Sequence, residues 1–240
     1  GLLVVTCDGQ DVDYVAAIDT GNGKIAWKTD RTLDLPRKFS FSTPLVIEVQ
    51  GKQQIVCPGT GLVAAYEPKT GKEIWRVLYG DGYSVIPRPI FGHGMVYICS
   101  GWGVPTLFAI RPTGTGDVTD THVAWKQTSK ANVPHTPSAL LIKDELFMIS
   151  DTGIASCLDA HTGKLHYRKR IGGKFSASPT FADGKIFIQS ETGRGFVLKP
   201  GREFVELGRN QLDGRTYASY AVSDNALFIR TENRLYRIEE

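Results

Sequence analysis

A short phrase recurs along this chain of 240 residues and constrains its fold more than any other feature. Each copy joins a run of apolar residues that ends in a charged residue, through a turn, to an aromatic residue. The copies run from Ala17 to Trp27, from Ala65 to Trp75, in a stretched form from Ala109 to Trp125, and from Cys157 to Tyr167. The aromatic residues therefore lie 48, 50 and 42 positions apart (75−27, 125−75 and 167−125). Self-similarity at this period indicates stacked or radial repeats, and it outranks any single local motif as evidence of architecture.

Each repeat predicts four short strands separated by turns. In residues 41–80 the strands are expected at 43–47, 54–57, 63–66 and 73–76, and the same order returns in residues 135–173. Four short strands in ~40–50 residues are typical of a β-propeller blade, and helical periodicity is not sustained anywhere. The chain is therefore predicted to be all-β, a β-propeller of four-stranded antiparallel blades.

Six blades or part-blades can be counted within a single predicted domain of residues 1–240. Their bounds are 1–31, 39–80, 84–130, 133–173, 175–212 and 216–240. The first unit lacks an initial strand and the last lacks a final one, so both ends offer the same middle strands. Because such ends do not complement each other, we expect an arc of a seven- to eight-bladed ring. A six-bladed ring with imperfect terminal blades is the alternative.

Charge and hydrophobicity exclude some partners. The net charge is +3, and the basic residues are scattered, whereas a nucleic-acid-binding protein would show a basic stripe. No run approaches the ~20 apolar residues of a membrane span. The first residues, Gly1 to Val5, read as a strand and not as a signal peptide, so we expect a chain processed or truncated at its start.

The repeated aromatic residues are predicted to be structural. Trp27, Trp75, Trp125 and Tyr167 occupy equivalent outer positions, from which each ring can pack on the neighbouring blade. The cysteines are also expected to be structural: Cys7, Cys57 and Cys99 end the second strand of successive units, and Cys157 lies on a third strand. There is no CxxC pair and no His at zinc spacing, so we expect four free, buried thiols and no metal site. The insertion 112–121 is expected to be a flexible surface loop.

These residues resemble a known repeat. The Ala-Ile-Asp, Gly-Lys and Trp phrase, with Ser-Pro or Thr-Pro opening the next blade, is similar to the pyrroloquinoline quinone (PQQ)-type repeat. That repeat is found in quinoprotein alcohol dehydrogenases and in the non-catalytic outer-membrane assembly lipoprotein BamB, and the resemblance covers nearly the whole chain. It implies a ring of eight blades, and it implies export to the periplasm or another compartment outside the cytoplasm.

The resemblance does not carry a catalytic site with it. The dehydrogenases hold the quinone over a Trp floor and under a disulfide of adjacent cysteines, beside a Ca²⁺ ion and a catalytic Asp. This chain has no adjacent cysteine pair and no carboxylate cluster with Ca²⁺-ligand spacing. It also lacks the GxSxG, HExxH and P-loop motifs. We therefore expect no catalytic residues, no metal, and neither PQQ nor calcium in this segment.

Candidate binding residues lie in loops that lead from an outer strand to the next inner strand. Arg88 and His135 closely precede Pro89 and Pro137, so both are expected at the mouth of the channel, where a cationic rim would attract an anionic ligand. The alternative is that such residues merely solvate the rim. The further rim candidates are Arg37, Tyr83 and Tyr217.

Trp102 stands apart from the repeated tryptophans. It lies between Gly101 and Gly103 in the connection between the second and third strands of its unit. The ring is either presented to a partner, as an aromatic hot spot would be, or folded back over its own blade.

Three functions remain at this point. The first is a non-catalytic, extracytoplasmic scaffold of the BamB-like kind that binds proteins. The second is a sensor propeller for a small molecule or carbohydrate, in which Trp102, Tyr83 and Tyr217 would stack on the ligand. The third is a fragment of a PQQ-dependent dehydrogenase whose catalytic blades are missing.

Overall fold

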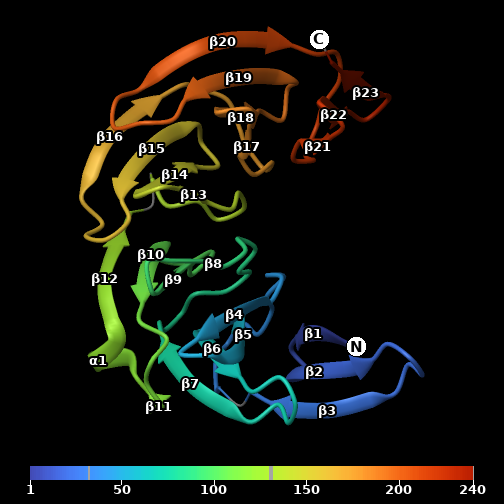
Figure 1. Ribbon diagram of the computed structural model, residues 1–240, viewed down its shortest axis with the longest axis vertical. Helices are drawn as coiled ribbons and strands as arrows, with labels where there is room; N and C mark the ends of the chain where they lie inside the picture. Colours follow the sequence, from blue (N-terminus) through green and yellow to red (C-terminus); the bar gives the residue numbers. More distant parts are fainter. Residues whose placement is uncertain (32, 130–131, 240) are drawn as a thin grey trace. The chain divides into compact units, whose positions relative to one another are not determined.

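The computed structural model describes residues 1–31, 33–129 and 132–239 (Figure 1). Residue 130, the predicted end of the third unit, and residue 240 lie outside the described residues. The chain divides into two compact units, Gly1–Ser129 and Lys130–Glu240. No helix among the described residues has the length and apolar character needed to cross a membrane.

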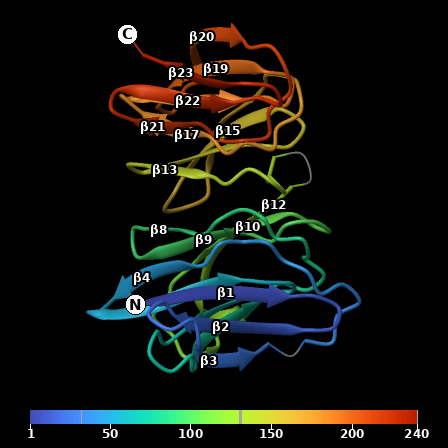
Figure 2. The ribbon, with the colours of Figure 1, turned by 90° about the vertical axis from the view of Figure 1, so that its right-hand side faces the viewer.

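The first unit contains three antiparallel sheets, and Figure 2 shows the strands of the first of them side by side. The first sheet consists of β1 (Leu2–Asp8), β2 (Asp13–Asp19) and β3 (Ile25–Asp30). The second consists of β4 (Leu45–Val49), β5 (Lys52–Pro58), β6 (Leu62–Tyr66) and β7 (Glu73–Leu78), to which the short strand β11 (Gly116–Asp117) is added in parallel at the outer edge. The third consists of β8 (Ile90–Gly92), β9 (Met95–Cys99), β10 (Thr106–Ile110) and β12 (Val123–Thr128). Between β10 and β12 lie the short strand β11 (Gly116–Asp117) and the helix α1 (Thr119–His122).

The second unit repeats this arrangement in three further sheets. The first consists of β13 (Leu140–Ile142), β14 (Glu145–Ile149), β15 (Ile154–Asp159) and β16 (Leu165–Arg170). The second consists of β17 (Thr180–Ala182), β18 (Lys185–Gln189), β19 (Arg194–Lys199) and β20 (Val205–Gln211). The third consists of β21 (Ala221–Ser223), β22 (Ala226–Arg230) and β23 (Leu235–Ile238). The predicted all-β fold of antiparallel propeller blades is confirmed, and the first and last sheets have three strands.

The recurring phrase of the sequence forms a β-bulge followed by a tight turn. In the second sheet Ala65 pairs with Trp75 while Tyr66 pairs with Glu73, so Ile74 is the extra residue of the bulge. The turn beyond the bulge closes with hydrogen bonds between Glu67 and Lys72 and between Gly71 and Glu67, both of 2.9 Å. The same register shift occurs between the last two strands of four other sheets, β2 and β3, β10 and β12, β15 and β16, and β19 and β20. It lies at Ala17/Ile18, Ala109/Ile110, Cys157/Leu158 and Val197/Leu198. Because a bulge sharpens the local twist, its repetition gives each blade the same outer-strand geometry.

The aromatic residue that follows the bulge contacts the turn of the next blade. The indole N–H of Trp27 donates to the carbonyl of Pro68 at 2.8 Å, and the Thr29 hydroxyl donates to the carbonyl of Gly71 at 2.7 Å. Trp75 makes the same connection through a relay: its N–H donates to Gln54 Oε1 at 2.8 Å, and Gln54 Nε2 donates to the carbonyl of Pro112 at 3.2 Å. The buried indole therefore removes apolar area from water while its N–H remains satisfied.

The other two repeated rings are less buried. Tyr167 packs edge-on against Phe204 of the next blade, with 5.7 Å between ring centroids. Trp125 is half-buried, and its ring lies 5.9 Å from that of Tyr97 in its own blade.

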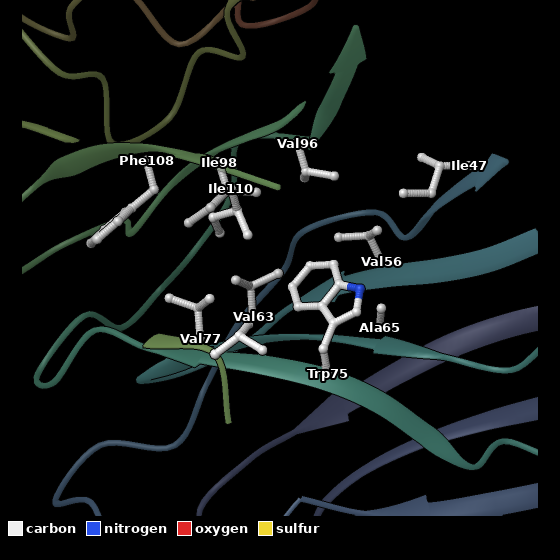
Figure 3. Packing of buried hydrophobic residues seen from close by; sticks show 11 residues of the cluster. Ile47, Val56, Val63, Ala65, Trp75, Val77, Val96, Ile98, Phe108 and Ile110 are labelled. Carbon is white, nitrogen blue, oxygen red and sulfur yellow. The ribbon is translucent and has the colours of Figure 1, made fainter. Parts of the chain in front are cut away.

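Apolar side chains fill the space between adjacent sheets. Figure 3 shows the cluster between the second and third sheets, in which Val56, Val63 and Trp75 face Val96 and Ile98. A second cluster joins Val15, Ala17 and Trp27 to the second sheet, and a third joins the first two sheets of the second unit around Phe175 and Phe196. Each blade thus has a core only where it meets a neighbour, as in other repeat proteins.

Two sequence-based expectations are wrong. The insertion 112–121 is not a free loop: Gly116 and Asp117 pair in parallel with Trp75 and Arg76, and Val118 is buried. The insertion protects the outer edge of β7, because an unpaired edge strand exposes its backbone groups.

Cys7 is half-buried, whereas Cys57, Cys99 and Cys157 are buried as expected. The reason is that Cys7 lies on β1, which forms an edge of its three-stranded sheet.

Gly71 and Gly23 provide a test of the contact between blades. They occupy the same turn position with φ of +70° and +71°, but an added Cβ would lie 2.3 Å from Trp27 Cε3 at Gly71 and would meet nothing within 4 Å at Gly23. Gly23→Ala should cost about 1–2 kcal/mol from left-handed backbone strain alone. Gly71→Ala should cost about 1–3 kcal/mol more, because Trp27 must move. Urea unfolding of both variants measures this difference, and equal losses would contradict the packing described.

Candidate functional site

The loops at one edge of the first unit hold most of its exposed aromatic side chains. Because the strands of each sheet alternate in direction, the loop from an outer strand to the next inner strand meets the loop between the second and third strands. In this unit the relevant loops are residues 31–44, 79–89 and 100–105, with residue 32 outside the described part. We call this edge the rim.

Backbone hydrogen bonds tie the three rim loops together. Ser84 N–H donates to the carbonyl of Phe39 at 2.7 Å, and Phe41 N–H donates to that of Val85 at 2.8 Å. Tyr83 and Trp102 exchange a reciprocal pair of N–H to carbonyl bonds of 3.1 and 2.8 Å. The three loops are therefore held together as one layer by backbone hydrogen bonds and present their side chains from a fixed backbone.

Five side chains on this layer form what we call the aromatic rim cluster: Arg37, Phe39, Phe41, Tyr83 and Trp102. The Arg37 guanidinium lies 4.5 Å from the centroid of the Tyr83 ring, a cation–π distance. Phe39 meets Tyr83 edge-on at 5.7 Å and packs on Phe41 at 6.3 Å. Trp102 is 45% exposed and Phe41 is 63% exposed. A cluster of aromatic rings beside an arginine, with two of the rings exposed, has the composition of a protein-binding hot spot.

The glycines on either side of Trp102 are required by the packing of its loop. Gly101 has φ of +73°, and a Cβ there would lie 2.5 Å from the Tyr83 carbonyl oxygen. Gly103 has φ of +104°, and a Cβ there would lie 3.0 Å from the Asp81 carbonyl oxygen. These contacts bring the Trp102 backbone against Tyr83 while almost half of the ring stays in solvent.

Beside the cluster lies a pocket of 240 Å³. Leu35, Pro36, Arg37, Thr60, Asp81 and Tyr83 line it. Its volume is below the ~300–1,000 Å³ of ordinary small-molecule sites, so it suits one side chain of a partner better than a whole ligand.

The structure brings together three of the six rim candidates from the sequence, namely Arg37, Tyr83 and Trp102. Arg88 is exposed near the end of the same loop as Tyr83 and is not among the residues of the cluster. His135 and Tyr217 belong to the second unit, where Tyr217 is 56% exposed. Phe39 and Phe41 were not selected from the sequence, although two Phe residues flanking Ser40 are a visible signal in a polar loop.

His135 is held by a carboxylate. Asp151 accepts hydrogen bonds from the backbone N–H groups of His135 at 2.7 Å and Thr136 at 3.1 Å, and its Oδ2 lies 3.3 Å from His135 Nδ1. Burial opposes the charged form of Asp151, but these hydrogen bonds prevail and hold its pKa below the ordinary value. The His135 side chain is thus fixed against its own blade.

Asp151 is one of three carboxylates that sequence reasoning missed. Glu191 and Glu232 follow it at intervals of 40 and 41 positions (191−151 and 232−191), each after a Ser or Thr. Glu191 accepts from the Ser176 hydroxyl at 2.7 Å, and Glu232 accepts from the Arg215 N–H at 3.1 Å. Each carboxylate therefore fastens the rim loop that enters its blade, and the regular interval in the sequence could have revealed them.

A buried ion cluster lies where the first rim loop begins. The Arg31 side chain is 2% exposed; its Nη2 pairs with Asp8, its Nε lies 3.6 Å from Asp13 Oδ1, and its Nη1 donates to the carbonyl of Cys57 at 3.3 Å. Arg31 thus links the first and second sheets of this unit. Burial and the neighbouring Asp8 together raise the pKa of Asp13 to about 6, despite the attraction of Arg31.

The described residues do not fit a bound quinone of the dehydrogenase kind. The four cysteines are free thiols, and burial raises the pKa of Cys57 and Cys157 to about 12, which keeps both protonated. Trp27 and Trp75 use their rings and N–H groups for contacts between blades, so neither is available as a floor for a cofactor.

Comparisons with known proteins agree on the repeat. The family model described as outer membrane protein assembly factor BamB matches residues 11–117 and 114–231. A search of curated protein sequences finds no significant match.

Solved structures share the fold at low sequence identity. BamB from Moraxella catarrhalis is 14% identical with a TM-score of 0.73, and the match covers 98% of this chain and 68% of that one. A quinohemoprotein alcohol dehydrogenase from Comamonas testosteroni is 15% identical with a TM-score of 0.62, and a europium-containing methanol dehydrogenase is 12% identical with a TM-score of 0.64. Both matches cover 88% of this chain, which spans 41% and 49% of the two dehydrogenases.

The carboxylates around Arg31 predict a pH dependence of stability. Asp13 binds its proton more tightly in the folded state than in the unfolded state, where its pKa is near 3.8. The contribution of Asp13 to folding should therefore weaken as the pH rises from about 4 to about 6. Because the side chain is 20% exposed and screened by solvent, we expect a change of about 1–2 kcal/mol.

Asp13→Asn should remove this dependence, so the variant should gain stability relative to the parent over that pH interval. Urea unfolding at several pH values measures the difference. An unchanged difference between pH 4 and pH 6 would contradict a raised pKa at Asp13. The lowered pKa of Asp151 acts in the opposite sense and only at more acidic pH, so it does not obscure the result.

Proposed function

Since the chain belongs to the family of the outer membrane protein assembly factor BamB, we propose that it is a non-catalytic PQQ-type repeat propeller that binds partner proteins outside the cytoplasm. The observation that carries this proposal is the aromatic rim cluster. Phe41 and Trp102 are exposed, Phe39 and Tyr83 are partly buried, and the loops that carry them are joined by backbone hydrogen bonds. Little conformational entropy is then lost when a partner binds, so more of the contact energy contributes to affinity.

The composition of the rim supports a protein partner over the other functions. Trp, Tyr and Arg are the residues that most often dominate binding energy in protein interfaces, and all three occur here. The apolar ring of Trp102 would be covered by a partner side chain, while Arg37 and Asp81 would supply the polar border. A small-molecule sensor is less well supported, because the pocket beside Tyr83 is small for a complete ligand.

The same reasoning separates this function from that of a dehydrogenase. The family is that of an outer membrane protein assembly factor, and we propose a related role for this chain as a scaffold in the cell envelope. We propose no cofactor, because Trp27, Trp75 and the three buried cysteines are committed to the contacts between and within blades.

A photoreactive amino acid placed at position 102 tests the proposal in the cells from which the sequence comes. Phe181 offers a matched control, because it is an aromatic residue with the same 45% exposure and lies on β17, outside the aromatic rim cluster. We expect a discrete cross-linked protein from position 102 and none from position 181. Absence of any adduct at position 102, with the protein correctly folded, would contradict a rim interface.

Trp102→Ala should weaken recovery of that partner about tenfold to thirtyfold, as expected for a hot-spot ring. Phe181→Ala should leave recovery unchanged. The midpoint of urea unfolding should be similar for both variants, because both rings are largely exposed. Equal recovery with Trp102→Ala and the parent would exclude the aromatic rim cluster as the centre of the interface.

A further inference from the structure

A second concave surface lies at the opposite edge of the second sheet. Three segments line it: the β4–β5 hairpin over residues 49–54, the β6–β7 turn over residues 67–74, and residues 112–116 of the insertion. The hairpin and the turn are at the strand ends away from the β5–β6 loop, which belongs to the rim edge. The surface has a volume of about 850 Å³, and we call it the basic groove.

The insertion creates the groove. Residues 116 and 117 pair with β7, so the chain that precedes them passes beside the β6–β7 turn. Gln54 anchors the same segment through its hydrogen bond to the Pro112 carbonyl. Figure 1 shows β11 beside β7. The groove is therefore held by a strand pairing and a buried amide, and it is not a gap beside a loose loop.

The charge in the groove is unbalanced. Lys52, Lys69 and Lys72 line it, and none of them forms an ion pair with a described residue. Of the two glutamates in the lining, Glu73 binds Arg76 at 2.6 and 2.7 Å, whereas Glu67 accepts from the neutral Thr70 hydroxyl at 2.5 Å and keeps its charge. Three lysines therefore stand against the one remaining carboxylate, Glu67, so the groove carries an excess of positive charge.

The position of Lys72 shows what is particular to this blade. The Gly-Lys turn also contains Lys24 in the first sheet and Lys164 in the fourth, and both of these lysines are exposed. A lysine at this point of the repeat is therefore an ordinary solvated residue. Of these three lysines, only Lys72 lies beside the insertion. Residues 112–116 of the insertion face its turn, and together the two segments form walls of the groove.

The other lining residues indicate what kind of ligand the groove can bind. Val49, Pro68, Ile74 and Pro112 give apolar surface, and Gln53, Thr113 and Thr115 offer hydrogen-bonding groups. The lysines come from two separate loops, and the volume of about 850 Å³ is far more than a single phosphate group would fill. No aromatic ring is among the lining residues, so a sugar would have no stacking platform.

We propose that the basic groove binds an extended acidic segment of a partner protein, with carboxylates facing the three lysines and apolar side chains against the proline and isoleucine surfaces. Charge complementarity of this kind guides encounter and fixes register. This site is separate from the aromatic rim cluster and does not depend on the function proposed for it. The chain would then hold one partner at each edge of the second sheet, or two segments of the same partner.

A fluorescein-labelled synthetic peptide of aspartate, glutamate and leucine serves as the probe, with binding measured by fluorescence anisotropy at physiological salt. The test variant is Lys52→Glu/Lys72→Glu, and the matched control is Lys24→Glu/Lys164→Glu. Both variants change the net charge equally, and all four lysines are exposed, so both proteins should fold. We expect the test variant to weaken binding about tenfold or more and the control to leave it within about twofold.

Two outcomes would overturn the proposal. Equal losses in the two variants would mean that the peptide responds only to overall charge. Displacement of the peptide by inorganic pyrophosphate or by polygalacturonate at equal or lower concentration would mean that the groove takes a phosphate or an acidic polysaccharide. Trp102→Ala should leave peptide binding unchanged; a loss in that variant would place the peptide at the rim and overturn the groove without affecting the function proposed for the rim.

Discussion

The contact between an outer-strand ring and the turn of the next blade is the interaction on which the rest of this structure depends. Single blades are too thin to bury a core, so their apolar faces become a core only when two sheets meet. Trp27 contributes both apolar packing and a hydrogen bond to this contact, because its ring packs against Gly71 while its N–H donates to the Pro68 carbonyl. The β-bulge before each ring gives the outer strand the twist that aims the ring at its neighbour.

Trp75 shows how the same contact tolerates a change in the chain. The stretched third copy of the repeat moves its turn away, and Gln54 bridges the distance between the indole N–H and the Pro112 carbonyl. Gly116 and Asp117 of the stretched copy pair with β7 as β11. A single insertion therefore covers an edge strand, extends a contact between blades and forms the wall of the basic groove.

The two edges of the second sheet have different chemistry for a topological reason. At the rim, chain segments pass between blades, and their backbones can pair with one another, as Tyr83 does with Trp102. Aromatic side chains are then held out from a fixed layer. At the other edge the connections are hairpins within a blade, which carry the Gly-Lys turns of the repeat and hence its lysines. The two edges suit an apolar partner surface and an acidic segment, respectively.

The sequence by itself determined the repeat, the order of four strands in each blade and the small, buried positions such as Cys57 and Cys99, because these follow from local alternation, turn chemistry and the period of one phrase. It also pointed to Arg37, Tyr83 and Trp102, but singly and not as one cluster. Their proximity depends on hydrogen bonds between loops that are far apart in sequence, and no local pattern encodes such pairing. The path of the insertion could not be predicted from the sequence for the same reason. A run rich in Gly and Thr is typical of a loop, and part of it becomes a strand only because the outer edge of β7 is open for pairing. The environment of Asp13 was likewise decided by tertiary structure, because burial and the nearby Asp8, brought together with Arg31 by the sheet, set its pKa.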